Sequence, residues 1–304
     1  MIEKRFGWWP RNSTVDARAT RVDLLTTFDA SIAAVKDDPR AYDGWYYPPL
    51  EPVRSSSGEA KSPPHIPAPI YELPSTHLIV GSEGWMDDDY LHFVIALIVL
   101  VDGIRLVPEG WQHFYKTPIR GHKLADLVCD NRELAEIVFV ATNWWQAHAI
   151  DERRAMFAAI HWFCFSGLYH HEFEEFSAKY TVMDTLYWIY KQYYPGRIAH
   201  SERPAKMASA YGLQTPAWAV IVKNSRGKDS CRLAEIRNDL VHEAKFAGKP
   251  IGFAHLPELS LTLELGAFLT RLIIAMLDVK CSYIQTSTDT RCNHGLGLTK
   301  RHLA

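Results

Sequence analysis

Residues 150 to 194, "IDERRAMFAAIHWFCFSGLYHHEFEEFSAKYTVMDTLYWIYKQYY", decide the expected fold. The first part places four apolar side chains on one broad face of a helix: Met156, Ile160, Phe163 and Leu168. Asp151 is expected to cap the start of this helix. The second part keeps apolar residues at helical spacing until Pro195, which does not continue a helix. The segment therefore predicts two consecutive long helices.

Helical spacing of apolar residues recurs in other parts of the chain. "DDDYLHFVIALIVLVDG" (87 to 103) has an aspartate to cap its start and a glycine to end it, so it predicts a buried helix. "KLADLVCDNRELAEIVFVATNWW" predicts a helix that starts around Gly121. A helix around residues 234 to 243 and an apolar one over residues 258 to 281 complete the set. The second half of the chain therefore reads as a bundle of four or more helices.

The beginning of the chain is different. Residues 1 to about 80 are rich in proline, glycine and aromatic residues, and "YYPPLEPVRSSSGEAKSPPHIPAPIYELP" holds eight prolines without helical spacing. We therefore expect a mainly α protein: a mixed, proline- and aromatic-rich N-terminal domain over residues 1–122, and a helical bundle over residues 123–304. The bundle would have a loosely ordered tail from about residue 285.

Composition narrows the class of protein. Hydrophobic residues make up 47% of the 304 residues, enough for a sizeable core. The five cysteines are widely spaced and form no CxxC pair, which favours free thiols in a reducing compartment. The longest apolar run, residues 93 to 101, is shorter than the ~20 residues that span a bilayer. We expect a cytoplasmic protein with no export signal and no membrane contact.

Charge is unevenly distributed along the chain. The net charge is −2, which argues against a general nucleic-acid-binding protein. Residues 191 to 250, however, contain 11 Lys and Arg residues and five Asp and Glu residues, a local charge of +6. A basic segment in an acidic protein hints at a local site for a polyanion, although a solvated face without a partner is as good an interpretation.

Within this basic segment, "AEIRNDLVHEAKFAGKP" (234 to 250) carries the candidate site residues Arg237, Asn238 and His242. An Arg five positions before a His is expected about once by chance in this chain; requiring Asn directly after the Arg lowers that expectation to roughly 0.02. At 100° per residue, Asn238 and His242 share a helix face, whereas Arg237 and His242 lie about 140° apart. The arginine must therefore lean around the helix, the helix must end near the histidine, or a second copy in a dimer must complete the site.

These three residue types suit the cleavage of a phosphodiester without a metal. An imidazole with a pKa near 6.5 takes a proton from a ribose 2′-hydroxyl or gives one to the leaving 5′-oxygen. A guanidinium binds phosphate and stabilises the charge of the transition state. For an isolated helix, an ordinary arginine ion pair and a partly buried histidine are the more frequent explanation.

"RNDLVH" resembles the Arg-x4-His motif of the HEPN superfamily of helical ribonucleases, with a polar residue after the arginine. Residues 153 to 190 look like the first two helices of Apea-like HEPN domains, and Asp184 stands where those relatives usually carry glutamate. The resemblance covers about residues 123 to 285.

The resemblance implies a bundle that dimerises so that two motif helices meet in a cleft. It implies metal-independent RNA cleavage by His242 and Arg237, supported by Asn238, with no cofactor. Many members of this superfamily are toxins or act in defence against phage, with a cognate antitoxin or defence partner. Others have lost catalysis and only bind RNA or protein, which is the alternative function for this chain.

Other candidate sites are weaker. His170 with Glu174, and His171 with Glu175, have the i, i+4 spacing of a helix-borne metal site, but no second helix of this kind is present and salt-bridged surface is favoured. No metal is therefore expected. The N-terminal aromatic residues Trp8, Trp9, Trp45, Tyr46 and Tyr47 suit stacking on bases, but core packing is favoured for them.

Overall fold

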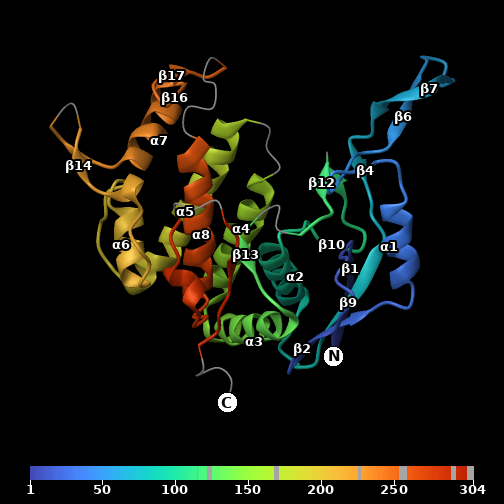
Figure 1. Ribbon diagram of the computed structural model, residues 1–304, viewed down its shortest axis with the longest axis horizontal. Helices are drawn as coiled ribbons and strands as arrows, with labels where there is room; N and C mark the ends of the chain where they lie inside the picture. Colours follow the sequence, from blue (N-terminus) through green and yellow to red (C-terminus); the bar gives the residue numbers. More distant parts are fainter. Residues whose placement is uncertain are drawn as a thin grey trace. The chain divides into compact units, whose positions relative to one another are not determined.

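The computed structural model describes residues 1–114, 116–121, 125–167, 171–224, 227–252, 259–288 and 292–299. The chain divides into two compact units, Met1–Lys123 and Leu124–Ala304 (Figure 1). The sequence placed a domain boundary after residue 122. If the protein is a ribonuclease, we expect residues 1–122 to serve in sensing or recruitment, and this role stays a prediction.

The expectation of a mainly α fold, with a helical bundle as its defining part, is wrong. The structure is mixed α/β: 46% of the residues are helical and 19% lie in strands that form several small sheets. Many of these strands have only two or three residues. A strand that short shows no alternation of apolar and polar residues, so little in the sequence indicates it.

The N-terminal unit contains two described helices, α1 (Phe28–Lys36) and α2 (Asp88–Asp102). Its described strands are β1 (Ile2–Gly7), β2 (Val15–Ala17), β3 (Thr20–Leu24), β4 (Ala41–Tyr42), β5 (Trp45–Tyr46), β6 (Leu50–Arg54), β7 (Ala60–Pro67), β8 (Ile70–Tyr71), β9 (Ser75–Gly81), β10 (Val107–Pro108), β11 (His113–Phe114) and β12 (Thr117–Pro118). Five of these strands form an antiparallel sheet in the order β10-β1-β9-β3-β2. In Figure 1, β1 and β9 lie between α1 and α2.

Helix α2 confirms the expected buried helix. The Asp87 side chain accepts a hydrogen bond from the backbone N–H of Tyr90, and Gly103 ends the helix in the left-handed conformation at φ 62°. Core packing is also confirmed for Trp8 and Trp9, which are 1% and 0% exposed. These indole rings are therefore not available for stacking on a nucleic-acid base.

The C-terminal unit is built mainly of helices. Those described are α3 (Asn131–Ala147), α4 (Ile150–Ser166), α5 (Glu172–Tyr193), α6 (Arg203–Ala210), α7 (Arg232–Glu243), α8 (Leu259–Met276) and the 3₁₀ helices η1 (Ala217–Ala219) and η2 (Ser282–Gln285). The described strands are β13 (Leu127–Val128), β14 (Val222–Lys223), β15 (Asp229–Ser230), β16 (Lys245–Phe246), β17 (Lys249–Pro250) and β18 (His294–Gly295). Helix α5 packs against α4, α6, α7 and α8 and is the central element of this unit (Figure 1).

Two helices start elsewhere than expected. Helix α3 begins at Asn131 rather than near Gly121, because Asp130 and Glu133 form a capping box and the preceding residues form β13. Helix α4 is preceded by Ala149 as its N-cap, and Asp151 lies within its first turn. Strand β13 pairs in parallel with β18, so the described part of the expected loose tail is joined to the start of the unit.

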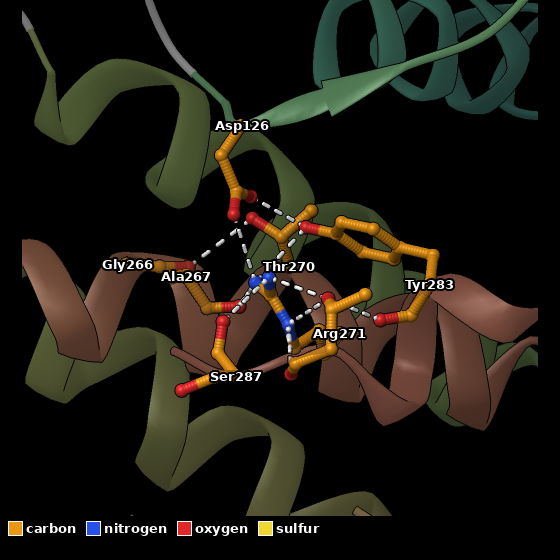
Figure 2. Close-up of polar contacts among 8 residues, drawn as sticks. Asp126, Gly266, Ala267, Thr270, Arg271, Tyr283 and Ser287 are labelled. Carbon is orange, nitrogen blue, oxygen red and sulfur yellow. Dashed lines mark hydrogen bonds and ion pairs between the residues drawn. The ribbon is translucent and has the colours of Figure 1, made fainter. Parts of the chain in front are cut away.

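A buried arginine fixes the end of α8 (Figure 2). Arg271 is 1% exposed, and its Nη1 lies 3.0 Å from Asp126 Oδ2. The same guanidinium donates to the Thr286 hydroxyl at 2.8 Å and to the Ser287 carbonyl at 3.2 Å. The Tyr283 hydroxyl donates to the other oxygen of Asp126 at 2.5 Å. This network satisfies a buried charge and ties α8 to η2 and to the residue before β13.

Candidate functional site

Helix α7 holds the motif residues at its exposed end. Its first two turns bury Leu233, Ala234 and Ile236, which anchor the helix to the unit. Leu240 is only half-buried, and Val241 is 58% exposed. The second half of the helix has therefore left the core, and the residues on it face solvent.

Helix α7 ends next to the motif. It stops at Glu243, and Ala244 takes a left-handed conformation at φ 50°. This agrees with the expectation that the helix ends near His242. Both Asn238 and His242 are exposed, while Arg237 is half-buried.

The structure brings the three motif residues together within one chain. Arg237 Nη1 donates to Asn238 Oδ1 at 3.1 Å and lies 3.4 Å from His242 Nε2. The 140° between the arginine and the histidine is bridged because the long arginine side chain leans along the helix surface. A second copy of the chain is not required to bring these groups into contact.

The contact between Arg237 and His242 occupies one ring nitrogen of the imidazole. A guanidinium has only donors, so a hydrogen bond from Arg237 makes Nε2 the acceptor. A phosphate that replaces Nε2 as the partner of the guanidinium would release this nitrogen.

Helix α5 places the Tyr180 ring beside Arg237. The guanidinium carbon of Arg237 lies 6.0 Å from the centre of the Tyr180 ring, a cation–π distance. Tyr180 is 6% exposed, and burial, followed by the charge of Asp184, raises the pKa of its hydroxyl. Tyr180 therefore stays protonated and works only as a hydrogen-bonding group.

A second histidine and a second arginine lie on the other side of Tyr180. The Tyr180 hydroxyl lies 2.8 Å from His200 Nδ1. Asp184 Oδ1 lies 2.6 Å from Arg203 Nη1 and 3.9 Å from His200 Nδ1. The Arg203 guanidinium also stacks on Tyr187 at 4.2 Å, and its Nε is buried with no hydrogen-bond partner in the described part of the chain.

These groups affect the protonation of His200. Burial and then the Arg203 charge lower the pKa of its imidazole; Arg237 acts in the same direction and Asp184 opposes them. Arg237 on α7 and Arg203 on α6 therefore act on the same imidazole.

Sequence reasoning missed Tyr180, His200 and Arg203. His200 lies in the loop between α5 and α6, where no periodicity points to it, and Tyr180 looked like a core aromatic. The available sign was the basic segment, which contains both His200 and Arg203. Asp184, singled out by the resemblance, has its ion pair with Arg203 and lies 3.9 Å from His200 Nδ1.

Part of the positive charge of the segment is neutralised locally. Lys223 lies 3.0 Å from Asp229, and Lys245 lies 2.7 Å from Glu243. These exposed pairs weaken the general basic character of the segment. Arg203 is likewise paired with Asp184, so near Tyr180 the charge relevant to a ligand is that of Arg237.

The weaker candidates give no site among the described residues. Glu175 pairs with Lys179 at 2.5 Å, but Lys179 is 6% exposed, so this is a partly buried ion pair and not the salt-bridged surface that was favoured; His170 lies outside the described residues. Over the described ranges, no three or more His, Cys, Asp or Glu side chains are grouped so as to hold a metal ion. Among the helices that the structure describes, none has the length and apolarity needed to cross a membrane.

Comparison of the chain with known proteins gives no match. No protein-family model matches it, and neither a curated protein nor a solved structure does so. The functional interpretation therefore rests on the residues and the geometry described above.

Proposed function

We propose that this protein is a metal-independent endoribonuclease that cleaves RNA through attack by the ribose 2′-hydroxyl. The observation that carries the proposal is the contact of Arg237 Nη1 with both Asn238 and His242 at the exposed end of α7. This contact puts an imidazole that can act as acid or base directly beside a guanidinium that can bind phosphate. The likeness of "RNDLVH" to the HEPN motif, and the basic segment, support the same proposal.

The proposed reaction needs a phosphate to enter beside Arg237. The guanidinium turns from His242 to the phosphate oxygens, and Asn238 orients either the imidazole or the phosphate. The released imidazole of His242 then exchanges a proton with the ribose or with the leaving oxygen. The products are a 2′,3′-cyclic phosphate and a free 5′-hydroxyl.

The proposal extends to the setting in which the protein works. Its RNA target would be cut in the manner of a toxin or a phage-defence effector, held in check by a cognate antitoxin or defence partner. A homodimer formed through the C-terminal unit would place two such sites in one assembly. Sedimentation at several protein concentrations tests the dimer directly.

The test is cleavage of mixed cellular RNA in EDTA. Wild-type protein should cut it, while His242→Ala and Arg237→Ala should each lose about 10²-fold or more of the rate. Equal activity in all three proteins, or activity that appears only with added Mg²⁺, would remove both residues from the mechanism. Lys223→Ala, at an exposed ion pair on the β14–β15 hairpin, is the matched control and should keep the wild-type rate.

One contact favours a second candidate, an RNA-binding or assembly module without catalysis. Arg237 already occupies His242 Nε2, the nitrogen that the reaction requires. If that pair were purely structural, the protein would bind RNA in the presence of EDTA and release it uncut. A filter-binding measurement beside the cleavage assay separates the two functions.

A further inference from the structure

His200 is placed as a reactive group rather than as a packed one. It lies in the loop between α5 and α6, and its side chain is 38% exposed. The Tyr180 hydroxyl engages Nδ1 at 2.8 Å, which leaves Nε2 as the ring nitrogen not held by Tyr180. An imidazole fixed through one nitrogen and open at the other is the arrangement of a general base.

The groups near Nδ1 of His200 favour the use of its other ring nitrogen as a proton acceptor. With Tyr180 accepting from Nδ1–H, the lone pair lies on Nε2. When Nε2 takes up a proton, the carboxylate of Asp184, whose Oδ1 is 3.9 Å from Nδ1, stabilises the imidazolium. The lowered pKa of His200 keeps the ring neutral, and thus able to accept a proton, in the free protein near pH 7.

The position of His200 relative to Arg237 suits a shared phosphate. Tyr180 contacts both residues: its ring lies 6.0 Å from the Arg237 guanidinium carbon and 6.2 Å from the His200 ring centre. Arg203 belongs to the same region and is paired with Asp184 at 2.6 Å. A phosphodiester that binds Arg237 comes beside His242, and Tyr180 connects the same arginine to His200.

We propose that His200 is the second acid–base residue of this site, acting as the general base while His242 acts as the general acid. This inference rests on the proposed ribonuclease function. His200 Nε2 takes the proton of the 2′-hydroxyl as the 2′-oxygen forms its bond to phosphorus. The bond from phosphorus to the 5′-oxygen breaks, and the His242 imidazolium gives its proton to that oxygen. Both imidazoles then return to their first state by exchanging protons with water.

The two roles are separated by the leaving group. A 4-nitrophenolate leaves without being protonated, so an RNA oligonucleotide that ends in a 3′-(4-nitrophenyl) phosphate needs a base but no acid. We expect His242→Gln to be impaired by about 10²-fold or more on ordinary RNA and close to wild type on the ester. His200→Gln should be impaired to a similar degree on both substrates.

Chemical rescue separates catalysis from folding. The activity lost in His200→Gly should return in part with added imidazole, while the circular dichroism spectrum stays that of wild type. His161→Gly on α4, an exposed histidine outside the Tyr180 cluster, is the matched control and should show neither loss nor rescue. The ascending limb of the wild-type pH profile of kcat/KM should be absent in His200→Gln.

Each outcome decides the inference. An active wild type with unchanged kcat/KM in His200→Gln, or with a loss on ordinary RNA but not on the ester, overturns the base assignment and leaves the proposed function standing. Loss without imidazole rescue and with a changed circular dichroism spectrum gives His200 a structural role and also overturns it. A wild type that cuts neither substrate removes the proposed function and the inference together.

Discussion

Two arginines of the C-terminal unit show how differently the same side chain is used. Arg271 is 1% exposed and held by Asp126 and by the hydroxyl and carbonyl groups of the segment after α8 (Figure 2). Arg237 is half-buried and lies beside Asn238, His242 and the face of Tyr180. The donors of Arg271 are hydrogen-bonded inside the fold. Arg237, in contrast, bonds to exposed side chains that a ligand can replace. One arginine therefore stabilises the fold, and the other is available for chemistry.

The same substitution at both positions gives the largest contrast. Arg271→Met leaves Asp126 without its cation and should lower the free energy of unfolding by about 3–5 kcal/mol. Arg237→Met should lower it by less than about 1 kcal/mol, because its partners are exposed. Urea denaturation followed by circular dichroism measures both values. Equal losses in the two variants would remove the distinction between them.

Arg237→Lys tests the role of Arg237 in activity. Lysine keeps the charge but loses the planar fork that binds phosphate through two parallel hydrogen bonds. We expect the rate of RNA cleavage to fall by about 10²–10³-fold while the urea midpoint stays unchanged. Initial rates in EDTA check this. A wild-type rate would mean that a positive charge alone is enough at this position.

His77 and His200 differ in the same way, since the first serves the fold and the second is proposed to serve activity. His77 in β9 is fully buried, its Nε2 lies 3.1 Å from the Arg11 carbonyl, and burial lowers its pKa to about 4. The unfolded state, with a pKa near 6.5, binds the proton more readily between these values, so the stabilisation present above pH 6.5 is lost as the pH falls towards 4. The 2.5-unit difference corresponds to about 3 kcal/mol.

Unfolding midpoints of the wild type and of His77→Leu at pH 7 and pH 4.5 measure this effect. The wild type should lose more stability than the variant over that interval, because leucine does not titrate. The same acid slope in both proteins would exclude His77 as its source. His200, by contrast, should affect activity more than stability.

Tyr180→Phe should have a small effect on stability. It removes the hydroxyl that lies 2.8 Å from His200 Nδ1 but keeps the ring beside Arg237. Because His200 is partly exposed and water can replace the hydroxyl, the loss of unfolding free energy should be about 1 kcal/mol. Thermal unfolding measures it, with Tyr187→Phe as the matched control. A loss of 3 kcal/mol or more would mean that the pair serves the fold.

The sequence predicted the elements that carry their own end signals. Helix α2 lies between Asp87 and Gly103 as expected, because a capping aspartate and a left-handed glycine are local properties. Helix α3 was started too early because the apolar residues before Asp130 belong to β13, whose partner β18 is far along the chain. Short strands that depend on distant partners leave little pattern, and this is why a mixed α/β protein read as mainly α.

The candidate site was likewise predictable only in part. Arg237, Asn238 and His242 lie on one helix at a spacing that the sequence shows, and the structure adds only that the arginine leans far enough to reach the histidine. His200 and Arg203 reach the site through tertiary contacts with Tyr180 and Asp184, which no local spacing encodes. Their charge was visible in the basic segment, but their position was not.

The most direct test of the central claim uses a DNA oligonucleotide with a single ribonucleotide, incubated with the protein in EDTA. Wild-type protein should cut it once, directly after the ribonucleotide, and mass spectrometry should find a 2′,3′-cyclic phosphate on the upstream fragment. His242→Ala should leave the oligonucleotide intact, as should replacing the ribonucleotide by its deoxy form. Cleavage of the all-DNA control, or equal cleavage by wild type and His242→Ala, would contradict the account.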